Sequence, residues 1–164
     1  MTSPETETET LPTTSDAEAE AISDELIEQQ TSSREIIETA ISSLDAEGTA
    51  MVAQSEEGFL WKFQYGSVEV FIQMTGESDE DIFTVWAAVL PLPAKNEDAL
   101  FRKLMEMNWS GTFETSFGIY NQQIVISCQR AIADLSPQEV SRAITLVCSI
   151  ADEYNESLKA EFGQ

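Results

Sequence analysis

The sequence predicts an α+β fold with an antiparallel sheet. Segments with the period-two alternation of strands follow one another between residues 51 and 90, and two more lie between residues 113 and 126. Segments with helical spacing come before, between and after these strands. Consecutive strands interrupted by helices are typical of an α+β fold with an antiparallel sheet. The predicted order is α-β-β-β-α-β-β-α, and a short extra strand at 51–55 stays open.

The charged residues divide the chain into a tail and one domain. The 164 residues include 30 acidic and 8 basic side chains, which gives a formal net charge of -22 at pH 7. Residues 1–31 carry only acidic charges and few apolar side chains, so they cannot offset the entropy cost of ordering. We expect a disordered acidic tail over 1–31, with a short helix near 16–30 left open, and a single domain over 32–164.

The acidic balance also limits the partners and the location. A charge of this sign repels nucleic acid and anionic membrane surfaces, so we expect neither as a partner. No segment approaches the roughly 20 apolar residues of a membrane span, and the N-terminus lacks the basic start and apolar stretch of a secretion signal. We therefore expect a cytoplasmic protein without membrane insertion.

The first helix of the domain has a recognisable start. Ser32 and Glu35 have the spacing of a capping box, and Gly48 is placed to close the helix. The apolar positions between them recur at spacings of three and four, as one buried side of a helix requires. They are Ile36, Ile37, Ala40, Ile41 and Leu44.

Three strands follow this helix. Residues 59–65 and 68–74 alternate between apolar and mixed positions, with Gly66-Ser67 as the turn, so they predict a hairpin with one buried face. Residues 82–90, IFTVWAAVL, are apolar on both alternating faces, which predicts a strand covered on both sides. Some other element or molecule should therefore cover its second face.

The loop 75–81, TGESDED, is the densest acidic cluster of the domain. A calcium loop needs oxygen ligands at fixed alternations, a glycine within the loop and a closing bidentate glutamate. Here Gly76 precedes the acidic residues, and no closing glutamate follows at the right distance. We expect neither a metal site nor a cofactor.

A second helix and a last hairpin follow. Asn96 is the predicted cap, because Glu97 and Asp98 then match the positive end of the helix dipole. The body of this helix contributes Leu100, Phe101, Leu104 and Met107. The hairpin is predicted from Phe113, Phe117, Ile119, the turn at Tyr120-Asn121, Ile124, Val125 and Ile126.

The closing helix has the best-marked start. Ser136 stands at the cap, Pro137 at the first helical position and Glu139 three residues after the cap. Its apolar arc spans roughly 200°, which is more than a helix lying on one sheet needs. We therefore expect a second contact. The arc comprises Val140, Ala143, Ile144, Leu146, Val147, Cys148, Ile150, Ala151, Tyr154 and Leu158.

The order of elements and the segment from residue 104 to 158 resemble the YbjN-like proteins and, more distantly, the class I chaperones of type III secretion. The positions that carry the resemblance are Leu104, Asn108, Gly111, Phe113, Ile124, Ile126, Leu135, Tyr154 and Leu158. The resemblance covers about residues 32–158. It implies an α+β fold, often dimeric, with apolar surface that binds another polypeptide or regulates a process, and no known reaction chemistry.

The residues themselves do not indicate an enzyme. The chain has no histidine, no GxSxG, no GxxxxGK[ST] and no dinucleotide fingerprint. Cys128 lies in a strand and Cys148 on the closing helix, so both are expected to be free core thiols. We expect no catalytic residues.

The preferred hypothesis is a non-catalytic protein-binding module, chaperone-like or regulatory, that acts through apolar surface of a homodimer. The surface is expected at Leu146 and Ile150 of the closing helix and at Trp86 and Phe71 of the strands. One alternative is a small-ligand or metal-responsive regulatory domain, with a pocket lined by Trp61, Trp86 or Trp109. Another is a monomer whose helices cover the whole apolar surface.

Overall fold

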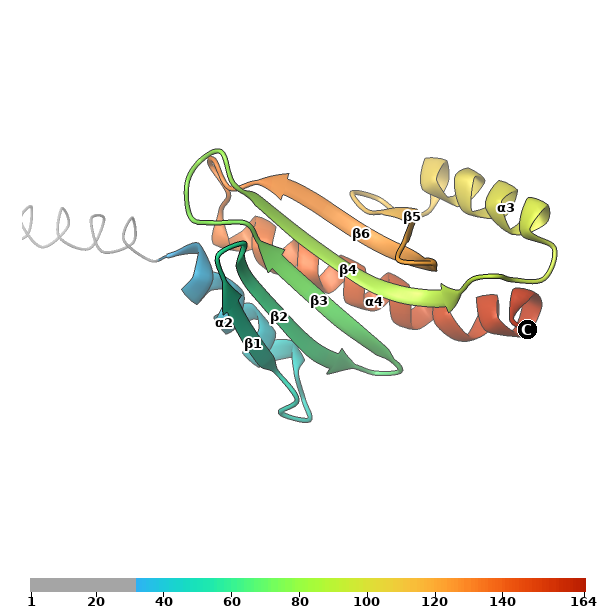
Figure 1. Cartoon of the computed structure of the whole chain (residues 1–164), viewed down its shortest axis with the longest axis horizontal. Helices are drawn as coiled ribbons and strands as arrows, with labels where there is room; N and C mark the ends of the chain where they lie inside the picture. The colour runs from blue at the N-terminus through green and yellow to red at the C-terminus, as the bar shows by residue number, and fades with distance from the viewer. Residues whose placement is uncertain (1–31) are drawn as a thin grey trace, which may run out of the picture. The chain divides into compact units, whose positions relative to one another are not determined.

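The computed structural model describes residues 32–164 (Figure 1). The tail and the short helix expected within residues 1–31 lie outside the described residues. The elements in chain order are α2 (Ser33–Leu44), β1 (Met51–Ser55), β2 (Gly58–Tyr65), β3 (Val68–Met74), β4 (Ile82–Pro91), α3 (Glu97–Ser110), β5 (Ser116–Tyr120), β6 (Gln123–Ala131) and α4 (Pro137–Phe162).

The strands form one six-stranded sheet in the order β1-β2-β3-β4-β6-β5, and every pair of neighbours is antiparallel. The prediction of an α+β fold with an antiparallel sheet is confirmed, and the open question of a strand at 51–55 is settled by β1. Because β6 returns beside β4, the β5 strand becomes one edge of the sheet and β1 the other. The helix α3 packs against the β5 edge.

The start of α4 is fixed by its own side chains. The backbone N–H of Glu139 donates to Ser136 Oγ at 3.2 Å, and Glu139 Oε2 accepts from the Ser136 N–H at 2.9 Å. This is the predicted capping box. The Ser136 N–H is also the largest reason why the pKa of Glu139 lies below its ordinary value, and the Arg130 guanidinium adds to the effect.

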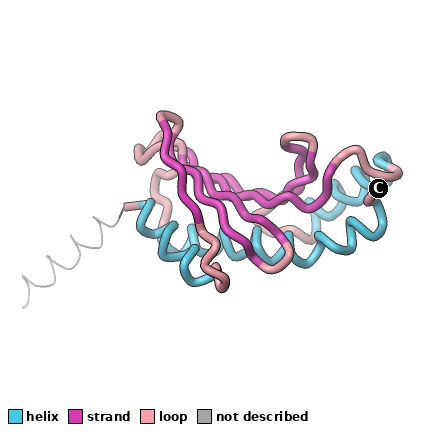
Figure 2. Tube along the Cα trace, turned by 60° about the horizontal axis from the view of Figure 1, so that its bottom comes forward, coloured by secondary structure: helices cyan, strands magenta, loops and turns pink. Residues whose placement is uncertain are grey.

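The core lies between the sheet and two helices. Figure 2 shows α2 and α4 below the strands. The helix α4 contacts β3, β4 and β6 on one side and α2 on another, which supplies the second contact that its broad apolar arc predicted. The largest side chains with almost no exposure are Phe63, Phe83, Ile37, Ile72, Met74, Leu90, Leu100, Ile124, Ile126, Ile144, Leu158 and Val70.

No helix or strand among residues 32–164 covers the second face of β4, so the expected cover by another molecule stays a prediction. The β4 side chains toward α4 are buried, whereas Thr84, Trp86 and Ala88 on the other face are half-buried. Both helices that cover the sheet lie on the same side of it (Figure 2). Neighbouring side chains on adjacent strands, and not a second layer, therefore provide the partial burial of this face.

Three local predictions also differ from the structure. Asn96 precedes α3, but its backbone is left-handed at φ 49° and its side chain makes no capping hydrogen bond. Phe113 lies outside the last hairpin, is exposed, and has φ 55° in the turn between α3 and β5. In the first helix the Glu35 N–H donates to Ser32 Oγ as predicted, but α2 ends at Leu44, before Gly48.

Candidate protein-binding surface

One face of the sheet is not covered by α2 or α4, and we call it the open face. Side chains alternate between the two faces along each strand, so the register of the ladder identifies its members. They align in rows across the strands. The rows are Leu60, Gln73, Thr84 and Gln129; then Lys62, Phe71, Trp86, Ser127 and Ser116; then Ala88, Val125 and Gly118.

Three aromatic rings lie next to one another on the open face. The rings of Phe71 and Trp86 are stacked, with centroids 5.4 Å apart and planes 13° apart. Tyr120 of the edge strand β5 meets Trp86 edge to face at a centroid distance of 5.9 Å. These contacts join three strands that are separate in the chain. The result is an aromatic row across the open face, half-buried at Phe71 and Trp86 and exposed at Tyr120.

A cavity of about 290 Å³ adjoins the aromatic row. Gly118 forms part of its wall, and a Cβ built there would meet no atom within 4 Å, so this position leaves space open beside the ring of Trp86. The side chains that line the cavity carry no formal charge. They are Gln73, Thr84, Trp86, Ile119, Tyr120, Val125, Ser127 and Gln129.

The few polar contacts on the open face occupy only part of its hydrogen-bonding capacity. The Gln129 amide donates to Thr84 Oγ1 at 3.4 Å. Lys62 and Glu69 form an ion pair at 2.7 Å at the side of the face away from the cavity. The cavity therefore offers rings, amides and hydroxyls to a bound group, and an uncharged group matches this lining.

The four predicted partner-surface residues fall into two places. Phe71 and Trp86 come together on the open face, in direct contact. Leu146 and Ile150 lie on α4, which packs on the opposite face of the sheet. Ile150 is only 5% exposed and belongs to the core, and Leu146 is half-buried. Their apolar character is explained largely by packing within the chain, because α4 is covered by both the sheet and α2.

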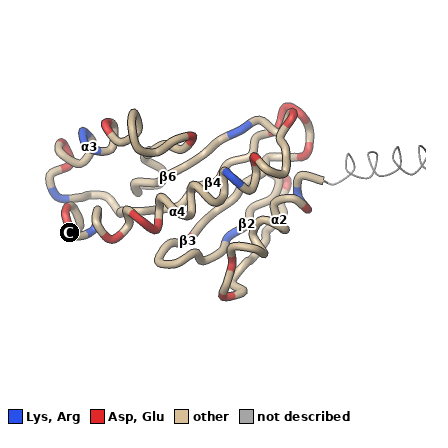
Figure 3. The backbone as a smooth tube through the Cα atoms, turned by 180° about the vertical axis from the view of Figure 1, so that it is seen from behind, with Lys and Arg blue, Asp and Glu red and all other residues tan. Residues whose placement is uncertain are grey.

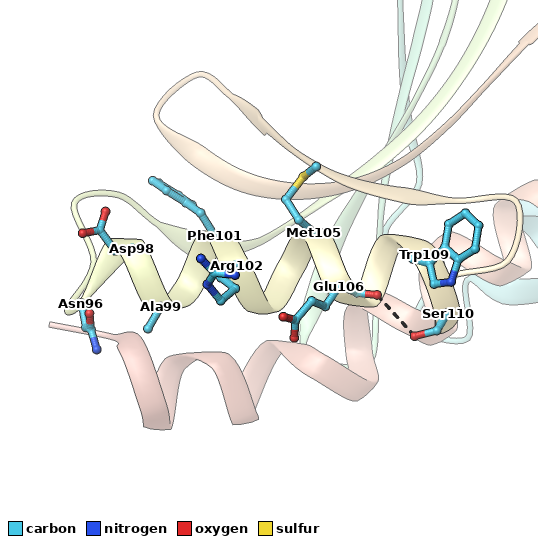
Figure 4. A pocket seen from close by; sticks show the side chains of 9 residues that line it. All are labelled: Asn96, Asp98, Ala99, Phe101, Arg102, Met105, Glu106, Trp109 and Ser110. Carbon is cyan, nitrogen blue, oxygen red and sulfur yellow. Dashed lines mark hydrogen bonds between the residues drawn. The ribbon is translucent and has the colours of Figure 1, made fainter.

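The three tryptophans proposed for a ligand pocket occupy different environments. Trp61 is buried and its indole N–H donates to Glu38 Oε1 at 3.3 Å. Trp86 lines the cavity of the open face. Trp109 lies at the end of α3 and is 93% exposed. Each of the three tryptophans lines a separate hollow, of about 160 Å³ at Trp61, about 290 Å³ at Trp86 and about 1150 Å³ along α3 at Trp109 (Figure 4), so no single pocket joins them.

Sequence reasoning missed two functional candidates. Tyr120 was assigned to a turn, although Ser116, Gly118 and Tyr120 alternate onto one face of β5. On α3, Phe101, Met105 and Trp109 recur every four residues and form a stripe along one side of the helix (Figure 4). We call these three residues the α3 stripe. Spacing alone would have revealed it.

The two thiols are protonated near neutral pH, and the acidic loop is held by hydrogen bonds among its own residues. Burial raises the pKa of Cys128 and raises that of Cys148 to about 12, so both remain thiols near neutral pH. In the loop between β3 and β4 (Figure 3), Asp81 accepts hydrogen bonds from Thr75 and Ser78, and the Ser78 hydroxyl is the main cause of its lowered pKa. Among residues 32–164, no three His, Cys, Asp or Glu side chains are grouped as metal ligands.

Comparisons with solved structures support the fold. The chain is similar to a chain in the crystal structure of the ExsC-ExsE complex, with a TM-score of 0.55, 16% identity, and coverage of 75% of this chain and 92% of that one. It is also similar to a chain in the structure of the HopA1-SchA chaperone-effector complex, with a TM-score of 0.53, 8% identity and the same two coverages.

No curated protein matches the sequence. Within the described part of the chain, no helix is long and apolar enough to cross a membrane. Residues 33–160, almost the whole described domain, match the YbjN family, whose description is "Putative bacterial sensory transduction regulator". The chain therefore belongs to the YbjN family.

Proposed function

We propose that this YbjN protein is a non-catalytic regulatory module that binds another polypeptide on the open face of its sheet and acts as a homodimer. The observation that carries the proposal is the aromatic row of Phe71, Trp86 and Tyr120, which lies beside a cavity on a face that no element of residues 32–164 covers. Aromatic side chains contribute strongly to binding when a partner removes them from water.

The chemistry of the open face fits a polypeptide segment. Backbone amides and carbonyls of an extended segment are neutral and need hydrogen-bonding partners, and the amides of Gln73 and Gln129 and the hydroxyls of Thr84 and Ser127 offer them. Complete burial of each large apolar side chain contributes about 1.5–3 kcal/mol, so the partly exposed rings can supply useful binding energy.

The comparisons agree with this class of function. The two similar structures are both complexes, and the HopA1-SchA structure is a complex of a chaperone with an effector. The family description names a regulator of sensory transduction. The protonated, buried state of Cys128 and Cys148 supports a binding role over thiol catalysis.

The test uses a variant that fills the cavity. Gly118→Arg places a long side chain where a Cβ meets no atom, so it should occupy the cavity and leave the fold intact. Thr145→Arg adds the same charge on an exposed position of α4, on the other side of the sheet, and serves as the matched control. Each of the three proteins serves as bait in an affinity capture from cell lysate. Proteins that the wild type and Thr145→Arg retain but Gly118→Arg loses are the candidate partners.

Titration of the purified candidate then decides the question. We expect Gly118→Arg to weaken its affinity at least about tenfold, while Thr145→Arg leaves the affinity unchanged. Equal affinity for the wild type and Gly118→Arg, with both proteins folded by circular dichroism, would remove the open face from the binding mechanism.

A small uncharged ligand is the second candidate occupant. The cavity volume of about 290 Å³ lies at the lower end of the range for small-molecule sites, and its lining combines rings with a few polar groups. A thermal-shift screen with neutral compounds tests this function. A true ligand should raise the melting temperature of the wild type and of Thr145→Arg, but not that of Gly118→Arg.

A further inference from the structure

One end of the sheet gives the open face an acidic margin. The register pairs Ser55 with Gly58 and Phe59 with Met74, so the β1–β2 turn and the loop 75–81 project from the same end of the strands (Figure 1). Together these two connections carry five exposed carboxylates, at Glu56, Glu57, Glu77, Asp79 and Glu80. Among residues 32–164, none of the five forms an ion pair with a basic side chain. Their negative charge is therefore available to a partner.

Apolar side chains connect this margin with the cavity of the open face. Leu60 and Ile82 lie on the open face and are 37% and 38% exposed. Ile82 directly follows the acidic loop, and Thr84, two residues further along β4, already lines the cavity. At about 3.3 Å per strand residue, Ile82 lies about 13 Å from Trp86 along the strand. An extended chain of about four to six residues therefore reaches from the ring of Trp86 to the carboxylates.

The cavity and the margin favour different side chains of one bound segment. The cavity is lined without formal charges, so it matches a large uncharged side chain. Lysine and arginine match the margin, because their aliphatic stems can lie on Leu60 and Ile82 while their charged ends reach the carboxylates. Hydrogen bonds between such charged groups are stronger than those between neutral groups.

The sign of the charge argues against the other occupants of this face. A second copy of the chain has the same formal net charge of -22, so it would bring further acidic side chains to the margin. Nucleic acid is repelled for the same reason. Within residues 32–164, no three His, Cys, Asp or Glu side chains are arranged as metal ligands, and Asp81 already accepts from Thr75 and Ser78. A basic polypeptide is the occupant that these observations favour.

We propose that the polypeptide bound on the open face is basic. One large uncharged side chain of the partner fills the cavity beside Trp86, and lysine or arginine side chains about four to six residues away lie over Leu60 and Ile82 and reach the acidic margin. This inference rests on the proposed function, because it assigns a chemistry to the partner of the same face. It adds one consequence that the open face alone does not have, which is that affinity depends on the partner's charge.

The first experiment selects binders of the full chain from a displayed library of random peptides of about twelve residues, which is long enough to cross the face. Gly118→Trp fills the cavity without adding charge, and Thr145→Trp, at an exposed position of α4, is its matched control. Peptides that bind the wild type and Thr145→Trp but not Gly118→Trp are retained. We expect lysine and arginine to be enriched at least about threefold in these peptides, at the stated spacing from a large uncharged side chain.

The second experiment repeats the selection with reversed charge at the margin. With Glu77→Lys and Glu80→Lys combined, the preference should change from basic to acidic residues at the same spacing. Glu153→Lys combined with Glu156→Lys changes the net charge equally at exposed positions of α4 and should keep the basic preference. A basic preference that survives the reversal at the margin would overturn the proposal.

Titration of one retained peptide measures the size of the effect. Glu77→Gln combined with Glu80→Gln should weaken its affinity about threefold to tenfold at about 50 mM salt, and the loss should shrink near about 500 mM because ions screen the charges. Glu153→Gln combined with Glu156→Gln should leave the affinity unchanged. The same affinity for the wild type and both combined variants would contradict the role of the margin.

Failure of this inference and failure of the proposed function give different results. If the retained peptides carry large uncharged side chains without an excess of lysine and arginine, the open face binds polypeptides and their proposed basic chemistry is wrong. If no peptide that binds the wild type is lost with Gly118→Trp, the open-face function fails, and this inference fails with it.

Discussion

The two faces of one sheet differ in composition as well as in coverage. In β4, the side chains toward α4 are Phe83, Val85, Ala87 and Val89, and all are buried. The alternate positions are Thr84, Trp86 and Ala88, and all are half-buried. The covered face of β4 is uniformly apolar, whereas the open face of the sheet mixes rings with hydroxyls and amides. A face closed within the chain needs only to fill space, but a face that meets an exchangeable partner must also remain compatible with water.

Replacing one phenylalanine on each face should give the largest difference. Phe83→Ala leaves a cavity in the core and should lower the free energy of unfolding by about 3–5 kcal/mol. Phe71→Ala removes mainly the stacking on Trp86 and should lower it by about 1 kcal/mol. Urea titration of both variants measures these losses. Similar losses for both would mean that the open face contributes to stability as a core does.

Replacing one amide on each face should give a smaller difference. Asn155 of α4 is buried and donates to Ser67 Oγ at 3.0 Å, which ties the turn between β2 and β3 to the helix. Asn155→Ala should cost about 1–2 kcal/mol. Gln129→Ala removes the exposed 3.4 Å bond to Thr84 on the open face and should cost less than about 0.5 kcal/mol. Urea midpoints with unchanged slopes provide the measurement, and a reversed order would contradict it.

The local elements could be predicted from sequence because short-range interactions determine them. Ser136 and Glu139 exchange hydrogen bonds three residues apart, so the start of α4 is encoded in four positions. The alternation in β2 and β3 likewise reports one buried face. By contrast, the backbone conformation of Asn96 depends on the connection from β4 to α3. Asparagine is a residue type that often caps helices, but its presence before α3 could not reveal a left-handed conformation.

The site was only partly predictable because an apolar pattern does not identify the neighbour that covers it. The broad arc of α4 and the two-sided pattern of β4 both indicated extra covering surface. For Ile150 the cover is supplied within the chain, whereas in the described part of the chain Trp86 is covered only by its strand neighbours. The contact of Tyr120 with Trp86 depends on the order β4-β6-β5, which the sequence pattern did not specify.

The smallest effect expected is the pH dependence that arises at the α4 side of the sheet. The N–H and the hydroxyl of Ser67 both donate to Asp152. The N–H makes the larger contribution and the hydroxyl the second in lowering the pKa of the Asp152 carboxyl below its ordinary value of 3.8. A group with a lower pKa in the folded state stabilises the fold above its unfolded pKa, and this stabilisation disappears as the pH falls through the folded pKa.

Acidification also changes the repulsion among the many carboxylates of α3, α4 and the loops (Figure 3), so the wild-type curve alone cannot isolate Asp152. The difference between the wild type and Asp152→Asn can, because both share that background. We expect the wild type to be the more stable at pH 6 and the difference to shrink as the pH falls below about 3.8. Glu153→Gln, which removes an exposed carboxylate beside it, is the control for net charge. Urea midpoints that keep a constant offset down to about pH 2.5 would show that the contact with Ser67 does not favour the ionised carboxyl.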